Sequence, residues 1–175
     1  MLKTNPLKDT RCYLSGPIEF GKNREDWRSE PTKELTKRFE IDLFDPFADP
    51  KQQWVPALKE ARKNSDYETM VKIAKSFVRK DLCMVDRVDF TIAYLPYGVP
   101  TTGTTHEIIN SNNAKKPTLL VTDSPSIAQI PLWYFGFIPT EFMFAGWESL
   151  FFYLEEVNNG KHMDNNRWDY VYGLI

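Results

Sequence analysis

The segment Asp81–Asp123 constrains the fold more than any other part of the chain. It contains an apolar strand at Val88–Leu95 (VDFTIAYL), a loop rich in proline, glycine and threonine, a helix at Thr104–Asn113 and a second apolar strand at Thr118–Thr122. Two buried strands joined by a helix form the crossover unit of a parallel sheet. The segment therefore predicts an α/β protein with helices packed on its sheet.

The rest of the chain repeats this alternation of strands and helices. Further strands are expected at Arg11–Ile18, Ile41–Phe44 and Ile138–Phe144; further helices are expected at Glu25–Phe39 (kinked or started late by Pro31), Ala57–Val85 (broken around Asn64–Ser65) and Trp147–Val157. The pattern predicts a single domain over residues 1–175. We expect a three-layer sandwich whose parallel, flavodoxin- or Rossmann-like sheet has about five strands.

Composition and charge exclude several classes of function. A hydrophobic fraction of 42% and a charged fraction of 26% are typical of a globular protein, and a net charge of −2 argues against a nucleic-acid-binding surface. No apolar run is long enough to span a membrane, and the first residues lack a signal-peptide core, so we expect a cytoplasmic protein. Cys12 and Cys83 lie inside apolar elements and are expected to be reduced core residues.

The sheet topology predicts where a ligand would bind. In open parallel sheets, ligands bind beyond the carboxyl ends of the strands. That rule brings the turn after the first strand (Tyr13, Ser15, Gly16) and the loop before Glu107 into one crevice. Glu107 itself has two interpretations: it interacts with the dipole at the start of its helix, or it is a catalytic carboxylate. Asp45 ends a strand at the same edge.

Several motifs together resemble one enzyme family. They are YLSGPI at Tyr13–Ile18, Asp81, Asp89, and GTTHE at Gly103–Glu107, with Asp81 preceding Glu107 by 26 positions. This combination is similar to the nucleoside 2-deoxyribosyltransferase family, including the related 2′-deoxynucleoside 5′-monophosphate N-glycosidases. The aromatic C-terminal RWDYVYGLI also resembles the end of family members.

The resemblance implies a role for three residues. Glu107 would be the nucleophile that attacks the anomeric carbon, Tyr13 would hold its carboxylate, and Asp81 would contact the nucleobase and help to protonate it. The implied chemistry needs no cofactor and no metal. Family members are homo-oligomers whose neighbouring subunits complete each active site, and the apolar segment Pro131–Trp147 is expected to serve as core and subunit contact.

One position departs from the transferase pattern. The family's transferases usually carry an Asp six residues before the nucleophile, whereas this chain has Thr101 there. The related N-glycosidases have a Ser at that position, where it contacts the 5′-phosphate. A hydroxyl suits a phosphate and a carboxylate repels it. We therefore expect a phosphate cradle at the helix start, completed by Lys22 or Arg24. The expected substrate-binding residues are Ser15, Gly16, Asp89, Thr101, Thr102, Gly103 and Thr104.

Three functions stay open on the sequence alone. The protein transfers a (deoxy)ribosyl group from a nucleoside or nucleotide to an acceptor base, hydrolyses a nucleoside 5′-monophosphate, or binds a nucleotide as a non-catalytic sensor. Asp89 has a structural alternative as a strand cap. His106 is expected to face solvent or pack on its helix, and His162 to be exposed.

Overall fold

The structure is a computed structural model that describes residues 5–18 and 26–174. Its centre is a parallel sheet of five strands in the order β2-β1-β3-β4-β5. The strands are β1 (Arg11–Ser15), β2 (Asp42–Phe44), β3 (Phe90–Tyr94), β4 (Thr118–Thr122) and β5 (Met143–Ala145). This flavodoxin-like order confirms the predicted fold class. It also places the topological switch point, where the strand order reverses and such folds bind ligands, between β1 and β3.

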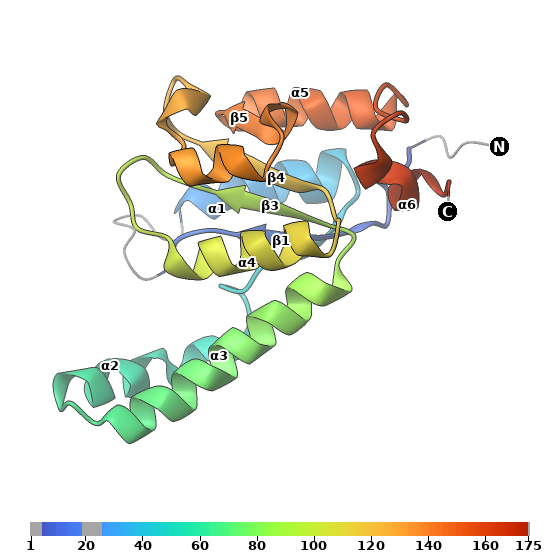
Figure 1. Ribbon diagram of the computed structural model, residues 1–175. Helices are drawn as coiled ribbons and strands as arrows, with labels where there is room; N and C mark the ends of the chain where they lie inside the picture. Colours follow the sequence, from blue (N-terminus) through green and yellow to red (C-terminus); the bar gives the residue numbers. More distant parts are fainter. Residues whose placement is uncertain (1–4, 19–25, 175) are drawn as a thin grey trace.

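Helices cover both faces of the sheet, as expected for a three-layer sandwich (Figure 1). On one face lie α1 (Asp26–Lys33) and α5 (Trp147–Asn158), whose residues Trp27 and Trp147 stack with ring centroids 5.9 Å apart. On the other lie α4 (Thr102–Asn113) and the end of α3 (Tyr67–Arg87). The central strands β3 and β4 are buried along their whole length, which explains their continuous apolar and β-branched sequences.

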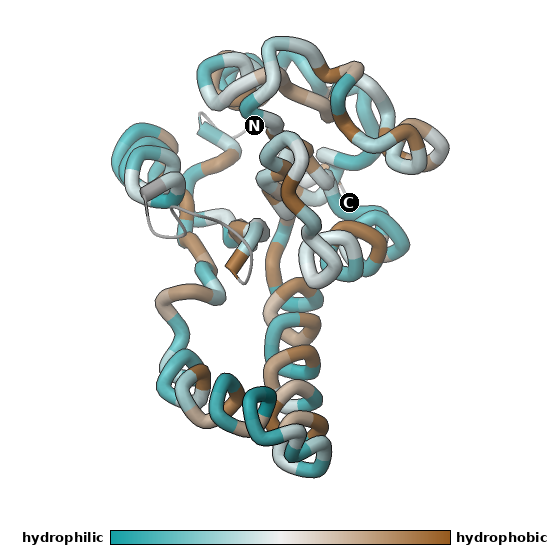
Figure 2. Tube along the Cα trace, turned by 90° about the vertical axis from the view of Figure 1, so that its left-hand side faces the viewer, coloured by the Kyte–Doolittle hydropathy of each residue, from teal (hydrophilic) through white to brown (hydrophobic). Residues whose placement is uncertain are grey.

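A helical hairpin extends away from the sheet. It consists of the 3-10 turn Pro50–Trp54, α2 (Val55–Lys63) and the long helix α3 (Figures 1 and 2). The predicted break at Asn64–Ser65 is confirmed: Ser65 has a φ of 54°, and the side chain of Asp66 accepts a hydrogen bond from the amide of Thr69 at 3.1 Å. The far end of α3 returns to the body, where Val85 packs near Tyr13 of β1.

Several predicted boundaries differ from the structure. Pro31 lies inside α1 without ending it, and a π-helical turn at Glu34–Arg38 follows. The strand predicted at Ile138–Phe144 is replaced by the shorter β5, because a 3-10 turn occupies Thr140–Phe142. Two further 3-10 turns, Ile127–Gln129 and Leu132–Gly136, precede it. The chain ends in a 3-10 turn at Asn166–Trp168 and the short helix α6 (Asp169–Tyr172).

The prediction that both cysteines are reduced core residues is confirmed for Cys12 and wrong for Cys83. Both thiols are free and Cys12 is buried in β1, but Cys83 is exposed, because it lies on a helix that leaves the body of the protein. Among the described residues, no helix is long and apolar enough to cross a membrane.

Candidate active site

Glu107 lies where α4 meets the carboxyl end of β1. Its side chain is buried, and each carboxylate oxygen has its own hydroxyl partner. The hydroxyl of Tyr13 donates to Oε1 at 2.8 Å, and the hydroxyl of Ser15 donates to Oε2. Tyr13 and Ser15 point to the same face of β1 because strand residues two apart do so. Glu107 is the sixth residue of α4 and so lies in its second turn, because the helix starts two residues earlier than predicted.

The environment of Glu107 perturbs its titration. Burial raises the pKa of the carboxyl, while the two hydroxyl donors and the charges of Lys51 and Arg28 oppose that rise. Burial and the nearby Glu107 also raise the pKa of Tyr13, which therefore remains a hydrogen-bond donor at neutral pH. The arrangement suits a carboxylate whose ionisation is controlled by its two neighbours on β1.

A cavity of about 190 Å³ opens beside Glu107. Its walls are the turn at residues 16–18, Pro46, Asp81, and the loop and helix start at residues 100–104. The structure thus brings Glu107, Asp81, Gly16 and the predicted phosphate-binding threonines to one cavity, at the edge of the sheet that the topology indicates. Chemically, it offers one buried carboxylate, one carboxylate on α3 and a helix N-terminus.

The start of α4 forms one wall of this cavity. Thr101 is the N-cap residue, and its side chain makes no capping hydrogen bond. Thr102 and Gly103 are exposed and Thr104 is buried. The first amides of a helix have no partner within it, so this wall can receive an anion. Lys22 and Arg24, expected to complete the cradle, lie outside the described residues.

Asp81 belongs to an ionic cluster that the sequence did not reveal. Its carboxylate pairs with the ammonium of Lys51, whose side chain is only 4% exposed. Asp49 caps the turn that carries Lys51, accepting the Lys51 amide at 2.8 Å, and binds Lys80 Nζ at 2.7 Å. Lys51 stands alone in a polar stretch, so its sequence context gave no signal of burial.

Arg28 is a second buried cation that sequence reasoning missed. Its guanidinium bonds Asp45 Oδ1 at 3.1 Å and donates to the carbonyls of Gly16 and Pro17 at 3.3 and 3.4 Å. It also lies over the ring of Trp27, 4.1 Å from the centroid. A Cβ atom on Gly16 would come within 2.4 Å of the same Trp27 ring. Arg28 and Trp27 therefore fix the turn that forms one wall of the cavity.

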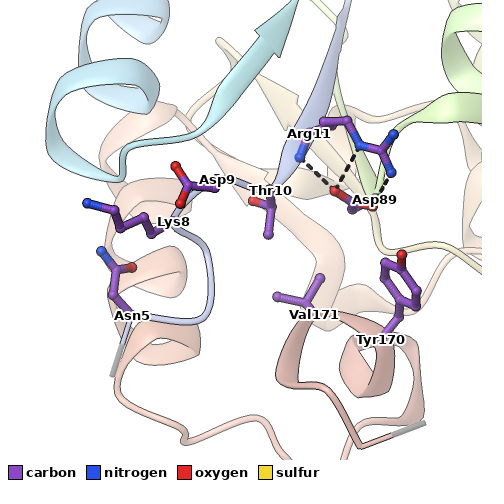
Figure 3. Close-up of a pocket in the computed structure, with 8 residues that line it drawn as sticks. All are labelled: Asn5, Lys8, Asp9, Thr10, Arg11, Asp89, Tyr170 and Val171. Carbon is purple, nitrogen blue, oxygen red and sulfur yellow. Dashed lines mark hydrogen bonds and ion pairs between the residues drawn. The ribbon is translucent and has the colours of Figure 1, made fainter. Parts of the chain in front are cut away.

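Asp89 does not lie with the other predicted site residues. It precedes β3 and sits at the amino end of the sheet, where Asp89 Oδ2 accepts the Arg11 amide at 2.7 Å and Oδ1 accepts the Arg11 guanidinium at 3.0 Å (Figure 3). The structure thus places Asp89 away from the cavity beside Glu107, in contacts that match its structural alternative as a strand cap. Strand direction is the reason: Asp89 directly precedes β3, so it lies at the end of the sheet opposite the carboxyl ends of the strands, where ligands bind.

Neither histidine reaches Glu107. His106 is exposed on α4, as expected. His162 is only partly exposed, since its ring packs on Tyr153 at 4.4 Å and lies 3.3 Å from Glu156, which corrects the expectation of full exposure. Within the described part of the chain, no group of three or more His, Cys, Asp or Glu side chains is arranged to hold a metal ion.

Comparison with known proteins identifies solved structures of similar fold. No family model and no curated protein matches the chain. A 2-deoxyribosyltransferase from Bacillus psychrosaccharolyticus superposes with a TM-score of 0.53 over 80% of this chain and 89% of that enzyme, at 19% identity. The 2-deoxyribosyltransferase from Leishmania mexicana gives 0.51 over 83% and 97%, at 16% identity. The chain is therefore structurally similar to 2-deoxyribosyltransferases over most of its length.

Proposed function

We propose that the protein cleaves the N-glycosidic bond of a (deoxy)nucleoside or its 5′-monophosphate through a covalent bond between the sugar and Glu107. The observation that carries this proposal is the buried Glu107 carboxylate, held by two hydroxyls and lining a cavity. A glutamate that only stabilised a helix would be expected in the first turn and in contact with solvent. The similarity in fold to 2-deoxyribosyltransferases agrees with this chemistry.

The residues present can divide the reaction between them. The bond to the base breaks through a transition state in which the sugar carries positive charge. Glu107, oriented by Tyr13 and Ser15, stabilises that charge and bonds to the anomeric carbon. The departing base keeps the electron pair of the broken bond and takes a proton from the Asp81 side of the cavity. Water or an acceptor base then attacks the sugar and releases Glu107.

The start of α4 favours a nucleotide over a free nucleoside. Thr101, Thr102 and Thr104 offer hydroxyls beside the free amides of a helix N-terminus, and no carboxylate stands at position 101. The hydrolase alternative, a (deoxy)nucleoside 5′-monophosphate N-glycosidase, uses the same residues and differs only in delivering the sugar to water.

We also propose that the protein is a cytoplasmic homo-oligomer. Tyr67, Val71 and Val78 lie at helical spacing along α3 and are exposed by 72%, 50% and 48%. Leu132 and Trp133, in the segment predicted to contact another subunit, are 83% and 79% exposed. Apolar surface of this extent is typical of an interaction face.

The test is a chromatographic assay with each deoxynucleoside and each deoxynucleoside monophosphate, with and without a free acceptor base. New nucleosides or nucleotides formed only with acceptor would establish a transferase. Free base released from monophosphates alone would establish the hydrolase.

The non-catalytic sensor makes a different prediction. A Glu107→Ala variant that still binds nucleotide, together with a wild-type protein that releases no base from any substrate, would favour the sensor and refute the proposed reaction.

A further inference from the structure

Lys51 is a buried ammonium beside the cavity. It lies in the 3-10 turn that follows β2 and is 5% exposed. Its Nζ pairs with the Asp81 carboxylate and lies 5.6 Å from the centroid of the Phe77 ring. Asp81 in turn lines the cavity that contains Glu107. The contacts thus link Lys51 through one carboxylate to the place where the nucleobase would leave.

We propose that Lys51 stores the proton that the departing base receives, and that Asp81 conducts it. This inference rests on the proposed function. As the bond between the anomeric carbon and the base nitrogen breaks, its electron pair stays on the base. The Lys51 ammonium gives a proton to the Asp81 oxygen that faces it, and the carboxylic acid that results gives a proton to the base, which leaves Asp81 ionised again and Lys51 as a neutral amine. When water attacks the sugar and frees Glu107, the proton that water releases returns to Lys51.

The ion pair explains why Asp81 needs such a source. An adjacent ammonium favours the ionised form of a carboxylate, and an ionised carboxylate has no proton to donate. A lysine in water holds its proton too tightly for this task, since proton transfer is most effective when the pKa of the donor is near the working pH. Burial lowers the pKa of Lys51 to about 8, which suits donation at neutral pH.

The charges around Lys51 are mixed. Asp45 follows β2, Asp49 caps the turn, and Glu107 faces Lys51 from α4; all three raise its pKa. Lys80 on α3 opposes them. Burial lowers the pKa of Lys51 by more than these three carboxylates raise it. A purely structural ion pair would stabilise the turn but would not make turnover depend on the titration of Lys51.

The pH dependence of base release tests the relay. Wild-type activity is expected to fall as the pH rises through about 8, because the donor loses its proton. Lys51→Met should reduce kcat by about 100-fold at pH 7 and move the alkaline limb to lower pH, because Asp81 must then be protonated itself. Lys51→Arg keeps the charge but cannot release a proton, so its activity should be low without a limb near pH 8.

Lys80→Met is the matched control. It removes the ammonium that bonds Asp49 and leaves the pair between Lys51 and Asp81 intact. Its kcat should be close to that of the wild type, with the alkaline limb at or slightly above its wild-type position. A Lys51→Met variant with a wild-type alkaline limb would overturn the relay while the proposed function stands. A wild-type protein that releases no base would overturn both.

A second readout does not need turnover. The titration of the Lys51 side chain, followed by nitrogen NMR of labelled lysine, should show a pKa near 8, and Asp81→Asn should lower that pKa further by removing the paired carboxylate. A Lys51 that titrates like a lysine in water, or that does not respond to Asp81→Asn, would refute the inference whatever the activity.

Discussion

Replacing Tyr13 with phenylalanine removes one of the two hydroxyls that hold Glu107. The Tyr13 hydroxyl lies 2.8 Å from Glu107 Oε1, and both side chains are buried, so water cannot easily replace it. A hydrogen bond to a charged group contributes about 1.5–3 kcal/mol. Because one pKa unit corresponds to about 1.4 kcal/mol, the Glu107 pKa should rise by about 1–2 units in Tyr13→Phe.

The sign of the effect on activity follows from the role of the carboxylate. Only ionised Glu107 can attack the sugar, and burial already raises its pKa. A further rise moves the acid limb of kcat/KM to higher pH by the same 1–2 units, a loss of about 10- to 100-fold on that limb that shrinks as the pH rises.

The assay is base release measured from pH 5 to pH 9. Tyr134→Phe is the matched control, because its hydroxyl lies 2.6 Å from Thr105 Oγ1 on the same helix, whereas Glu107 takes its hydroxyl donors from Tyr13 and Ser15. It should leave the acid limb in place. An acid limb that does not move in Tyr13→Phe would show that the Tyr13 hydroxyl does not control the ionisation of Glu107.

Three further substitutions test separate parts of the account. Glu107→Gln should abolish base release and raise the melting temperature at pH 7 by about 2–4 °C, a gain that should disappear below pH 4.5. Folding raises the pKa of this carboxyl, so the wild-type protein loses stability as the pH rises through that pKa. An unchanged melting temperature at pH 7 would argue against a costly burial of the charge. Gly16→Ala should lower the free energy of unfolding by about 1–3 kcal/mol, because the added Cβ would clash with the Trp27 ring. Gly103→Ala, whose Cβ would meet nothing within 4 Å, should leave the free energy of unfolding unchanged. Equal losses in thermal unfolding of the two variants would contradict this packing. Asp89→Asn should lose about 0–1 kcal/mol of stability and retain wild-type base release, and a loss of activity in a folded variant would restore Asp89 to the site.

The sequence predicted most of the fold because each signal was local and repeated. The buried strands β3 and β4 and the break at Ser65 appear where apolar runs and polar turns indicated them. Cys83 was misplaced because an apolar helical pattern does not reveal that its helix leaves the body of the protein.

The candidate site was only partly predictable. The family resemblance, and not periodicity, suggested that Tyr13 and Glu107 meet across 94 positions. Ser15 was expected to contact substrate but bonds Glu107, a difference that depends on side-chain direction. Lys51 and Arg28 were missed, because a single charge in a polar stretch is usually exposed and only the tertiary structure buries it.

The central claim is that Glu107 becomes covalently bonded to the sugar. The direct measurement is rapid acid quenching of the protein with a deoxynucleoside monophosphate, without acceptor base, followed by proteolysis and mass spectrometry of the peptides. The peptide containing Glu107 should gain the mass of the sugar phosphate, and the corresponding peptide of Glu107→Gln should not. Base release with that peptide unmodified at every quench time, or with the added mass on another residue, would contradict it.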